Sequence, residues 1–141
     1  MNVTVARALS SDVAPVCDLD RRVLGSDERS NHLQQKISAG QCYVARAGRQ
    51  VIGFVVTDRS FFGQAFVDLL IVDPAFRRRG VGTSLMHHVE SIWQPGKLFT
   101  STNASNVSMQ RLCESLGYVR SGVINNLDED DPEIVYFKRL I

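Results

Sequence analysis

The sequence predicts an α/β (α+β) fold in which a mixed β-sheet carries helices on both faces. The first observation is that short apolar strands alternate with amphipathic helices along the whole chain. The second is that 44% of the 141 residues are hydrophobic, which is sufficient for one core. The third is that the sequence contains no repeats, linkers or low-complexity segments. We therefore expect one domain over residues 1–141, with about seven strands and about four helices.

The segment 1–40 predicts a strand followed by two helices. Val3–Arg7 alternates apolar and polar residues, as a short strand does. The residues Ser-Ser-Asp at 10–12 offer N-cap chemistry to a helix that we expect to run to about Leu24. A second helix is expected over Asn31–Ala39, because a glycine follows directly and favours a helix end.

The segment 41–72 predicts a hairpin and a further strand. Cys42–Ala47 and Val51–Thr57 are rich in apolar residues, and Gly48-Arg49 between them suits a tight turn that joins antiparallel partners. A loop is expected over Ser60–Gly63. It leads into the strand Phe66–Val72, which ends before an Asp-Pro pair.

The remainder of the chain predicts two helices and three strands. A helix is expected directly after Gly80, because apolar residues recur on one helical face at spacings of 4, 4 and 3, namely Val81, Leu85, Val89 and Ile92. The turn residues Gln94–Gly96 end this helix. The other predicted elements are a strand, a short helix closed by Gly117, and two final strands: Leu98–Thr102, Val107–Leu116, Tyr118–Ile124 and Ile134–Leu140.

Composition excludes several classes of protein. A formal net charge of +1 provides no global basic field for nucleic acid. Cys17, Cys42 and Cys113 show neither Cys-x-x-Cys nor Cys/His ligand spacing, so we expect neither a metal site nor a disulfide framework. The N-terminal segment lacks an apolar signal region, and no run approaches the roughly 18 apolar residues of a membrane span. We therefore expect a cytoplasmic protein that binds neither nucleic acid nor membrane.

A loop rich in arginine and glycine joins the strand Phe66–Val72 to the next helix. Its pattern is Arg77-x-x-Gly80-x-Gly82. Free N–H groups and the helix dipole favour an anion at a helix start, and glycine lets the main chain approach a phosphate. A P-loop would need Gly-Lys-Ser/Thr, and a dinucleotide fingerprint would need glycine where the chain has Leu85. The pattern therefore predicts pyrophosphate binding; a helix start with solvated arginines is the alternative.

This motif resembles the acyl-CoA-binding motif of the GCN5-related N-acetyltransferase (GNAT) superfamily. The predicted order of strands and helices is also that of the GNAT fold, so the resemblance covers essentially the whole chain. A second segment, which includes Asn106, Met109, Leu112, Gly117 and Tyr118, is similar to the C-terminal motif of the family. The resemblance implies a bacterial-type, single-domain N-acetyltransferase.

The resemblance also implies acetyl-CoA as the acyl donor and assigns residues to it. The strand end is implied to pair with the pantetheine arm, and the loop with the helix start is implied to cradle the pyrophosphate. The implied cofactor-binding residues are Leu70, Ile71, Val72, Arg77, Arg78, Arg79, Gly80, Val81, Gly82, Thr83 and Asn106. For Asn106, a plain helix N-cap is the alternative interpretation.

The implied reaction is attack of a neutral amine on the thioester, with a base to take the amine proton. A backbone N–H near Val72 is the expected oxyanion donor. The chain departs from the family at two positions, because Cys113 replaces the usual acidic Tyr and Ser101 replaces a Glu that some relatives carry. Cys113 is a candidate acid or a buried apolar residue. Asp68 alternates with Leu70 and is a candidate base or a structural residue.

An acidic run lies between the last two predicted strands and comprises Asp128, Glu129, Asp130, Asp131 and Glu133. In the family fold this loop lies near the acceptor entrance, so an acidic rim would favour a cationic amine. A solvated turn is the alternative. We expect transfer of acetyl to a primary amine, preferably a small molecule. A protein N-terminus or lysine as acceptor, an acyl-CoA-binding module with lost or weak catalysis, and a homodimer are left open.

Overall fold

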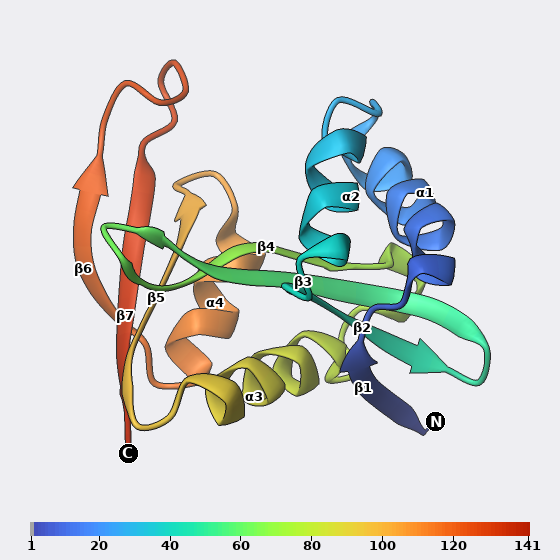
Figure 1. The fold of residues 1–141 in the computed structure, drawn as a ribbon. Coiled ribbons are helices and arrows are strands. Elements are labelled where there is room, and N and C mark those ends of the chain that lie inside the picture. Colours follow the sequence, from blue (N-terminus) through green and yellow to red (C-terminus); the bar gives the residue numbers. More distant parts are fainter. Residues whose placement is uncertain (1) are drawn as a thin grey trace. The chain divides into compact units, whose positions relative to one another are not determined.

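A computed structural model of the chain describes residues 2–141 (Figure 1). Its strands and α-helices are β1 (Val3–Arg7), α1 (Val13–Leu24), α2 (Ser30–Ser38), β2 (Cys42–Ala47), β3 (Gln50–Phe61), β4 (Gln64–Val72), α3 (Val81–Trp93), β5 (Gly96–Asn103), α4 (Val107–Ser115), β6 (Val119–Ile124) and β7 (Glu133–Leu140). Two short 3-10 turns are η1 (Ser10–Asp12) and η2 (Pro74–Phe76). The strands follow the sheet order β1-β2-β3-β4-β5-β7-β6, with β4 and β5 parallel and β5 and β7 antiparallel. The predicted mixed α/β fold is confirmed.

The chain forms two compact units. Unit 1 comprises the residues up to Thr57 together with Leu69–Val89. Unit 2 comprises Asp58–Asp68 together with Glu90–Ile141. The elements β3, β4 and α3 therefore contribute residues to both units.

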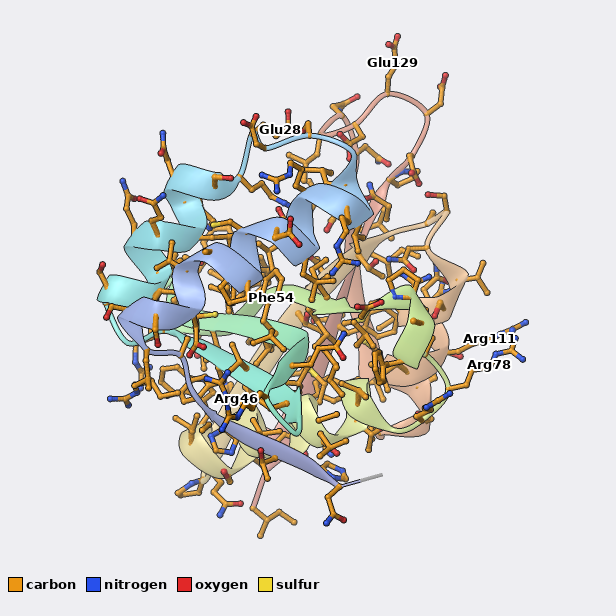
Figure 2. All side chains as sticks on the ribbon, turned by 90° about the vertical axis from the view of Figure 1, so that its right-hand side faces the viewer. Glu28, Arg46, Phe54, Arg78, Arg111 and Glu129 are labelled. Atoms are coloured by element: carbon orange, nitrogen blue, oxygen red, sulfur yellow. The ribbon has the colours of Figure 1, made fainter. Side chains whose placement is uncertain are left out.

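In unit 1, helices cover both faces of the strands (Figure 1). The helices α1 and α2 pack on the face that carries Phe54, which Figure 2 labels. The buried core there comprises Ala8, Val16, Leu19, Leu33, Ile37, Cys42, Val44, Val51, Phe54 and Val56. The start of α3 packs on the opposite face, because a Cβ at Gly53 would lie 3.2 Å from Val81 Cγ1 and 3.3 Å from Leu85 Cδ1. This close contact positions the first turn of α3 on β3.

The start of α1 is held by a buried carboxylate. Asp12 is 3% exposed, accepts a hydrogen bond from the N–H of Leu9 at 2.8 Å, and pairs with Arg46 at 2.6 Å. Asp12 occupies the N-cap position of α1, within the residues 10–12 that the sequence predicted, and these residues also form η1. The Asp12 side chain makes no hydrogen bond to α1, because it binds Arg46 and the N–H of Leu9 instead.

In unit 2, one face of the sheet carries α4 and the end of α3. Tyr136 of β7 donates to Glu114 of α4 at 3.3 Å, and Lys138 of β7 donates to Glu90 of α3 at 3.2 Å. The hydroxyl of Tyr118 donates to Glu90 at 2.6 Å. Because side chains alternate along a strand, residues between Tyr136 and Lys138 point to the opposite face.

Two sequence predictions differ from the structure. The loop expected at Ser60–Gly63 is a two-residue turn, because β3 continues to Phe61, whose ring stacks on Phe66 at 5.1 Å. The turn residues Phe62 and Gly63 have φ angles of 53° and 75°, as a tight hairpin turn requires. Ile92 was expected on the buried face of α3 but is 40% exposed.

Candidate active site

The end of β4 leads into a turn that Asp73 stabilises. The N–H of Asp73 donates to the carbonyl of Ile52 at 2.8 Å, and its carboxylate accepts from the N–H of Ala75 at 3.0 Å. Arg22 also lies 3.5 Å from this carboxylate. The side chain is 7% exposed, so these contacts compensate for its burial. The chain therefore leaves β4 in a defined direction before the arginine-rich loop.

The N-terminus of α3 presents free backbone donors. Arg78 and Gly80 adopt positive φ angles of 62° and 79°, which turn the chain into the helix. The first helical hydrogen bond runs from the N–H of Ser84 to the carbonyl of Gly80 at 2.9 Å. The N–H groups of residues 81–83 precede it and have no helical acceptor. This geometry and the helix dipole suit an anion at this position.

Three arginines add positive charge at the same helix start. Arg77, Arg78 and Arg79 are exposed, and Figure 2 shows Arg78 extending away from the ribbon. Within residues 2–141, no carboxylate pairs with any of the three. Arg79 lies over the ring of Phe76 at 5.6 Å. These guanidinium groups are therefore available to a phosphate-bearing ligand.

Sequence reasoning missed one residue that positions this region. A Cβ at Gly53 would lie 3.0 Å from the carbonyl oxygen of Ile71, which is tighter than an ordinary van der Waals contact, so glycine suits the close approach of β3 to β4. The half-buried segment Leu70–Val72 is thereby held on its β3 side. The signal in the sequence was a glycine inside an apolar strand.

The predicted cofactor-binding and catalytic residues are divided between the two units. Leu70–Val72 and Arg77–Thr83 lie in unit 1, whereas Asp68, Asn106 and Cys113 lie in unit 2. Asn106 caps α4, because its Oδ1 accepts from the N–H of Met109 at 3.1 Å. The side chain of Asn106 is exposed. Its capping of α4 does not test the predicted contact with a cofactor, which stays a prediction.

Asp68 is half-buried on β4. The recorded parallel pairing of β4 with β5 ends at Val67 and Thr100. Ser101 lies two residues beyond Phe99 on β5, on the face that carries Phe66. Asp68 follows the last paired residue of β4, and its role as a base stays a prediction.

Cys113 is fully buried on α4. Burial raises the pKa of the Cys113 thiol to about 12, with a smaller contribution from the negative charge of Glu114. A thiol with this pKa stays protonated at neutral pH and is a far weaker acid than an ordinary thiol with a pKa of about 8.5. These properties favour the alternative interpretation of Cys113 as a small apolar core residue.

Substitution of Cys113 by alanine tests the two interpretations. We expect kcat in the Cys113→Ala variant to stay within about twofold of wild type, because a fully buried thiol with a raised pKa is a poor proton donor. The pH–rate profiles from pH 6 to 9 should coincide. A loss of kcat at saturating substrate, with an unchanged melting temperature, would establish Cys113 as the proton donor.

The sequence analysis missed a contact that one residue of the acidic run makes in unit 2. Ser101 Oγ on β5 donates to Glu133 Oε2 on β7 at 2.8 Å. The sequence placed Glu133 at the end of the acidic run and Ser101 at a position where it could not act alone. Alternation along each strand indicates which face Ser101 and Glu133 occupy. Their contact, however, depends on the register of β5 against β7, which the sequence does not specify.

Within the described chain, no group of three or more His, Cys, Asp or Glu side chains is arranged to hold a metal ion. No helix in residues 2–141 is both long and apolar enough to cross a membrane.

Comparisons with known proteins agree with this geometry. A family model described as "Acetyltransferase (GNAT) domain" matches residues 38–120, which is more than half of the chain. The crystal structure of a GNAT-family acetyltransferase from Bacillus cereus is 36% identical and has a TM-score of 0.95, covering 100% of this chain and 99% of that chain.

Two further proteins are similar over different extents. yncA from Salmonella typhimurium, solved with its cofactor acetyl-CoA, is 16% identical, with a TM-score of 0.82 and coverage of 99% of this chain and 94% of that chain. This is a likeness in fold alone. N-alpha-acetyltransferase 30 from Xenopus laevis is 29% identical over 86 residues, or 56% of this chain. The chain covers 32% of that curated relative.

Proposed function

Because the chain belongs to the GNAT acetyltransferase family, we propose that it transfers an acetyl group from acetyl-CoA to a primary amine. The observation that carries this proposal is the start of α3, where free N–H groups follow the unpaired Arg77–Arg79 cluster. A pyrophosphate with an attached adenosine phosphate is the kind of anion that this arrangement suits. The free thiols of the three cysteines also support a cytoplasmic location.

The residues of unit 1 fit the donor in two ways. The N–H groups of Arg78–Thr83 would hold the pyrophosphate, and Arg77 and Arg78 would reach a further phosphate. The backbone of Leu70–Val72 would pair with the pantetheine amides as an added strand does. When bound, acetyl-CoA supplies the acetyl group as an activated thioester.

The residues of unit 2 provide the groups for the acceptor. Asp68 is proposed to take the proton that the attacking amine must lose, either directly or through water. The half-buried position of Asp68 supports this role, because it leaves the carboxylate within reach of a ligand. Asn106 is proposed to contact the donor with its amide NH2 group, since its Oδ1 is already used in capping α4.

The acidic β6–β7 loop contains two kinds of carboxylate. Asp128 accepts from Asn103 Nδ2 at 2.8 Å, and Asp131 accepts from Ser105 Oγ at 2.6 Å. These two residues therefore fasten the loop to the segment after β5. Glu129 is exposed at the tip of the loop, as Figure 2 shows, and Asp130 beside it is exposed as well. Only Glu129 and Asp130 are then proposed as the acidic rim for a cationic acceptor.

Neutralising the rim should affect charged acceptors selectively. In the Glu129→Gln, Asp130→Asn double variant we expect KM to rise roughly two- to fivefold for a polyamine. For an amine that carries no charge besides its reacting amino group, we expect KM to stay unchanged. The expected effect is small because water screens exposed charges. The effect should disappear in high salt. The control is Asp27→Asn, Glu28→Gln, which neutralises an exposed acidic pair in unit 1. Equal KM changes for both amines would contradict the acidic rim.

A protein N-terminus is the second candidate acceptor. The observation in its favour is the 29% identity over 86 residues to N-alpha-acetyltransferase 30. A small-molecule amine and a protein N-terminus present the same reacting group, so the cofactor residues proposed above apply to both.

The experiment that tests the proposed function combines calorimetry with a thiol-release assay. We expect acetyl-CoA to bind with a Kd on the order of micromolar, and free thiol to appear only when a suitable amine is added. Acetyl-CoA binding without turnover on small amines or peptides would favour the acyl-CoA-binding module. No binding of acetyl-CoA would overturn the proposed function.

A further inference from the structure

One sheet face in unit 2 combines aromatic side chains with charged ones. Glu133 lies towards the start of β7, and Arg139 at the other end lies 5.9 Å from the ring centroid of Phe137. Within that unit, α4 and the end of α3 pack on the face of Tyr136 and Lys138. The opposite face carries a phenylalanine platform in ring-to-ring contact, made of Phe61, Phe66, Phe99 and Phe137. All four rings are only half-buried, so no helix of unit 2 covers them. A contiguous, partly exposed apolar surface of this kind suits a ligand.

Glu133 lies on the same face and lacks a basic partner. Its neighbours on β7 with the same alternation are Val135 and Phe137. Ser101 Oγ donates to its carboxylate at 2.8 Å, and no Lys, Arg or His among residues 2–141 pairs with it. A neutral hydroxyl thus holds the orientation of this half-buried carboxylate.

Three other shielded carboxylates of the chain are paired with internal cations. Asp12 binds Arg46, and Asp20 binds Arg29 at 2.6 Å. Glu90 binds Lys138 at 3.2 Å. In each pair an internal cation compensates for the cost of shielding the carboxylate from water. Glu133 has no such internal cation, so a cationic ligand is the partner that its surroundings favour.

We propose that this face binds the acceptor, with the Glu133 carboxylate holding its ammonium group and the phenylalanine platform holding its apolar part. The inference rests on the proposed function and identifies the acceptor as a primary amine with a nearby apolar group. Glu133 determines specificity, and Ser101 is a positioning residue that acts through it. Asp68 at the end of the β4–β5 pairing keeps its separate proposed role in accepting the amine proton.

The spacing of the two subsites sets the shape of the acceptor. Ser101 and Phe99 are two residues apart on one strand, a separation of about 7 Å along the face. An apolar group about two carbons from the nitrogen would then lie on the platform while the nitrogen reaches Glu133. 2-Phenylethylamine and a peptide with N-terminal phenylalanine both have this chemistry, whereas ethanolamine does not.

The test measures amine binding directly and then turnover. Titration of 2-phenylethylamine should give saturable binding to the wild-type protein. In the Glu133→Gln variant, the Kd and KM for 2-phenylethylamine should rise at least about tenfold. The kcat and the Kd for acetyl-CoA should stay unchanged in this variant. Ser101→Ala should weaken binding less, and Ser101→Thr should restore it. The matched control is Glu114→Gln, which neutralises an exposed carboxylate on the other face of unit 2.

The platform and the source of the amine are tested in the same assay. Phe137→Leu should raise KM for 2-phenylethylamine and leave KM for ethanolamine unchanged. A higher kcat/KM for the peptide with N-terminal phenylalanine would identify the acceptor as a protein N-terminus. A higher kcat/KM for 2-phenylethylamine would identify it as a free amine. Unchanged amine affinity in Glu133→Gln, or equal affinity for ethanolamine and 2-phenylethylamine, would overturn the inference. Loss of acetyl-CoA binding alone would instead count against the proposed function, because amine titration needs no donor.

Discussion

Replacing Gly82 by tryptophan is expected to abolish acetyl-CoA binding. Gly82 lies in the first turn of α3, among the N–H groups proposed to hold the pyrophosphate. An indole there would occupy the space of the phosphate and remove at least two charge-assisted hydrogen bonds. At about 1.5 kcal/mol each, their loss raises Kd about 100-fold or more. Calorimetric titration of acetyl-CoA measures this change directly.

The control for this variant is Gly122→Trp. A Cβ at Gly122 on the exposed strand β6 would meet no atom within 4 Å, so the chain should tolerate tryptophan there. We expect wild-type acetyl-CoA affinity in Gly122→Trp and a comparable melting temperature in both variants. Undiminished affinity in Gly82→Trp would exclude the start of α3 as the phosphate site.

Removal of the Asp12 carboxylate is expected to cause the largest loss of stability. In Asp12→Ala, Arg46 would keep its charge in a shielded position and the N–H of Leu9 would lose its acceptor. Breaking one partner out of a buried ion pair costs about 3–5 kcal/mol of unfolding free energy. For a chain of this size that corresponds to a melting temperature lower by roughly 10–17 °C. Urea denaturation and thermal melting both measure the effect.

The matched control is Asp18→Ala. Asp18 pairs with Arg21 at 2.6 Å, the same distance as the pair of Asp12 and Arg46, but its side chain is 52% exposed. Water screens this pair, so its removal should change the unfolding free energy by no more than about 0.5 kcal/mol. A comparable loss in both variants would mean that burial does not decide the strength of these pairs.

Local patterns predicted most of the fold. Val3–Arg7 and Cys42–Ala47 form strands with the predicted bounds, because alternation and flanking turn residues act over a few positions. Gly117 follows the end of α4 with a φ of 89°, as expected of a glycine that ends a helix. The turn at Phe62 was predicted less well, since the stacking of Phe61 on Phe66 extends β3 beyond its apolar run.

The candidate site was predictable to the extent that its residues are adjacent in sequence. The pattern Arg77-x-x-Gly80-x-Gly82 specifies a loop and a helix start, and the structure has α3 beginning at Val81. The burial of Cys113 was not decided by its own segment. It follows from the packing of α4 on the sheet of unit 2, which raises the thiol pKa to about 12.

The sequence by itself determined the order of elements, the GNAT-like motif and the capping of α4 by Asn106, because each depends on residues within one or two turns of chain. Only the tertiary structure decided which distant side chains meet. Asp12 and Arg46 are separated by 34 positions, and Ser101 and Glu133 by 32. Strand register and helix packing bring such pairs together, and neither follows from local propensity. The contact of Glu133 with Ser101, and its lack of a basic partner among residues 2–141, are therefore properties of the fold.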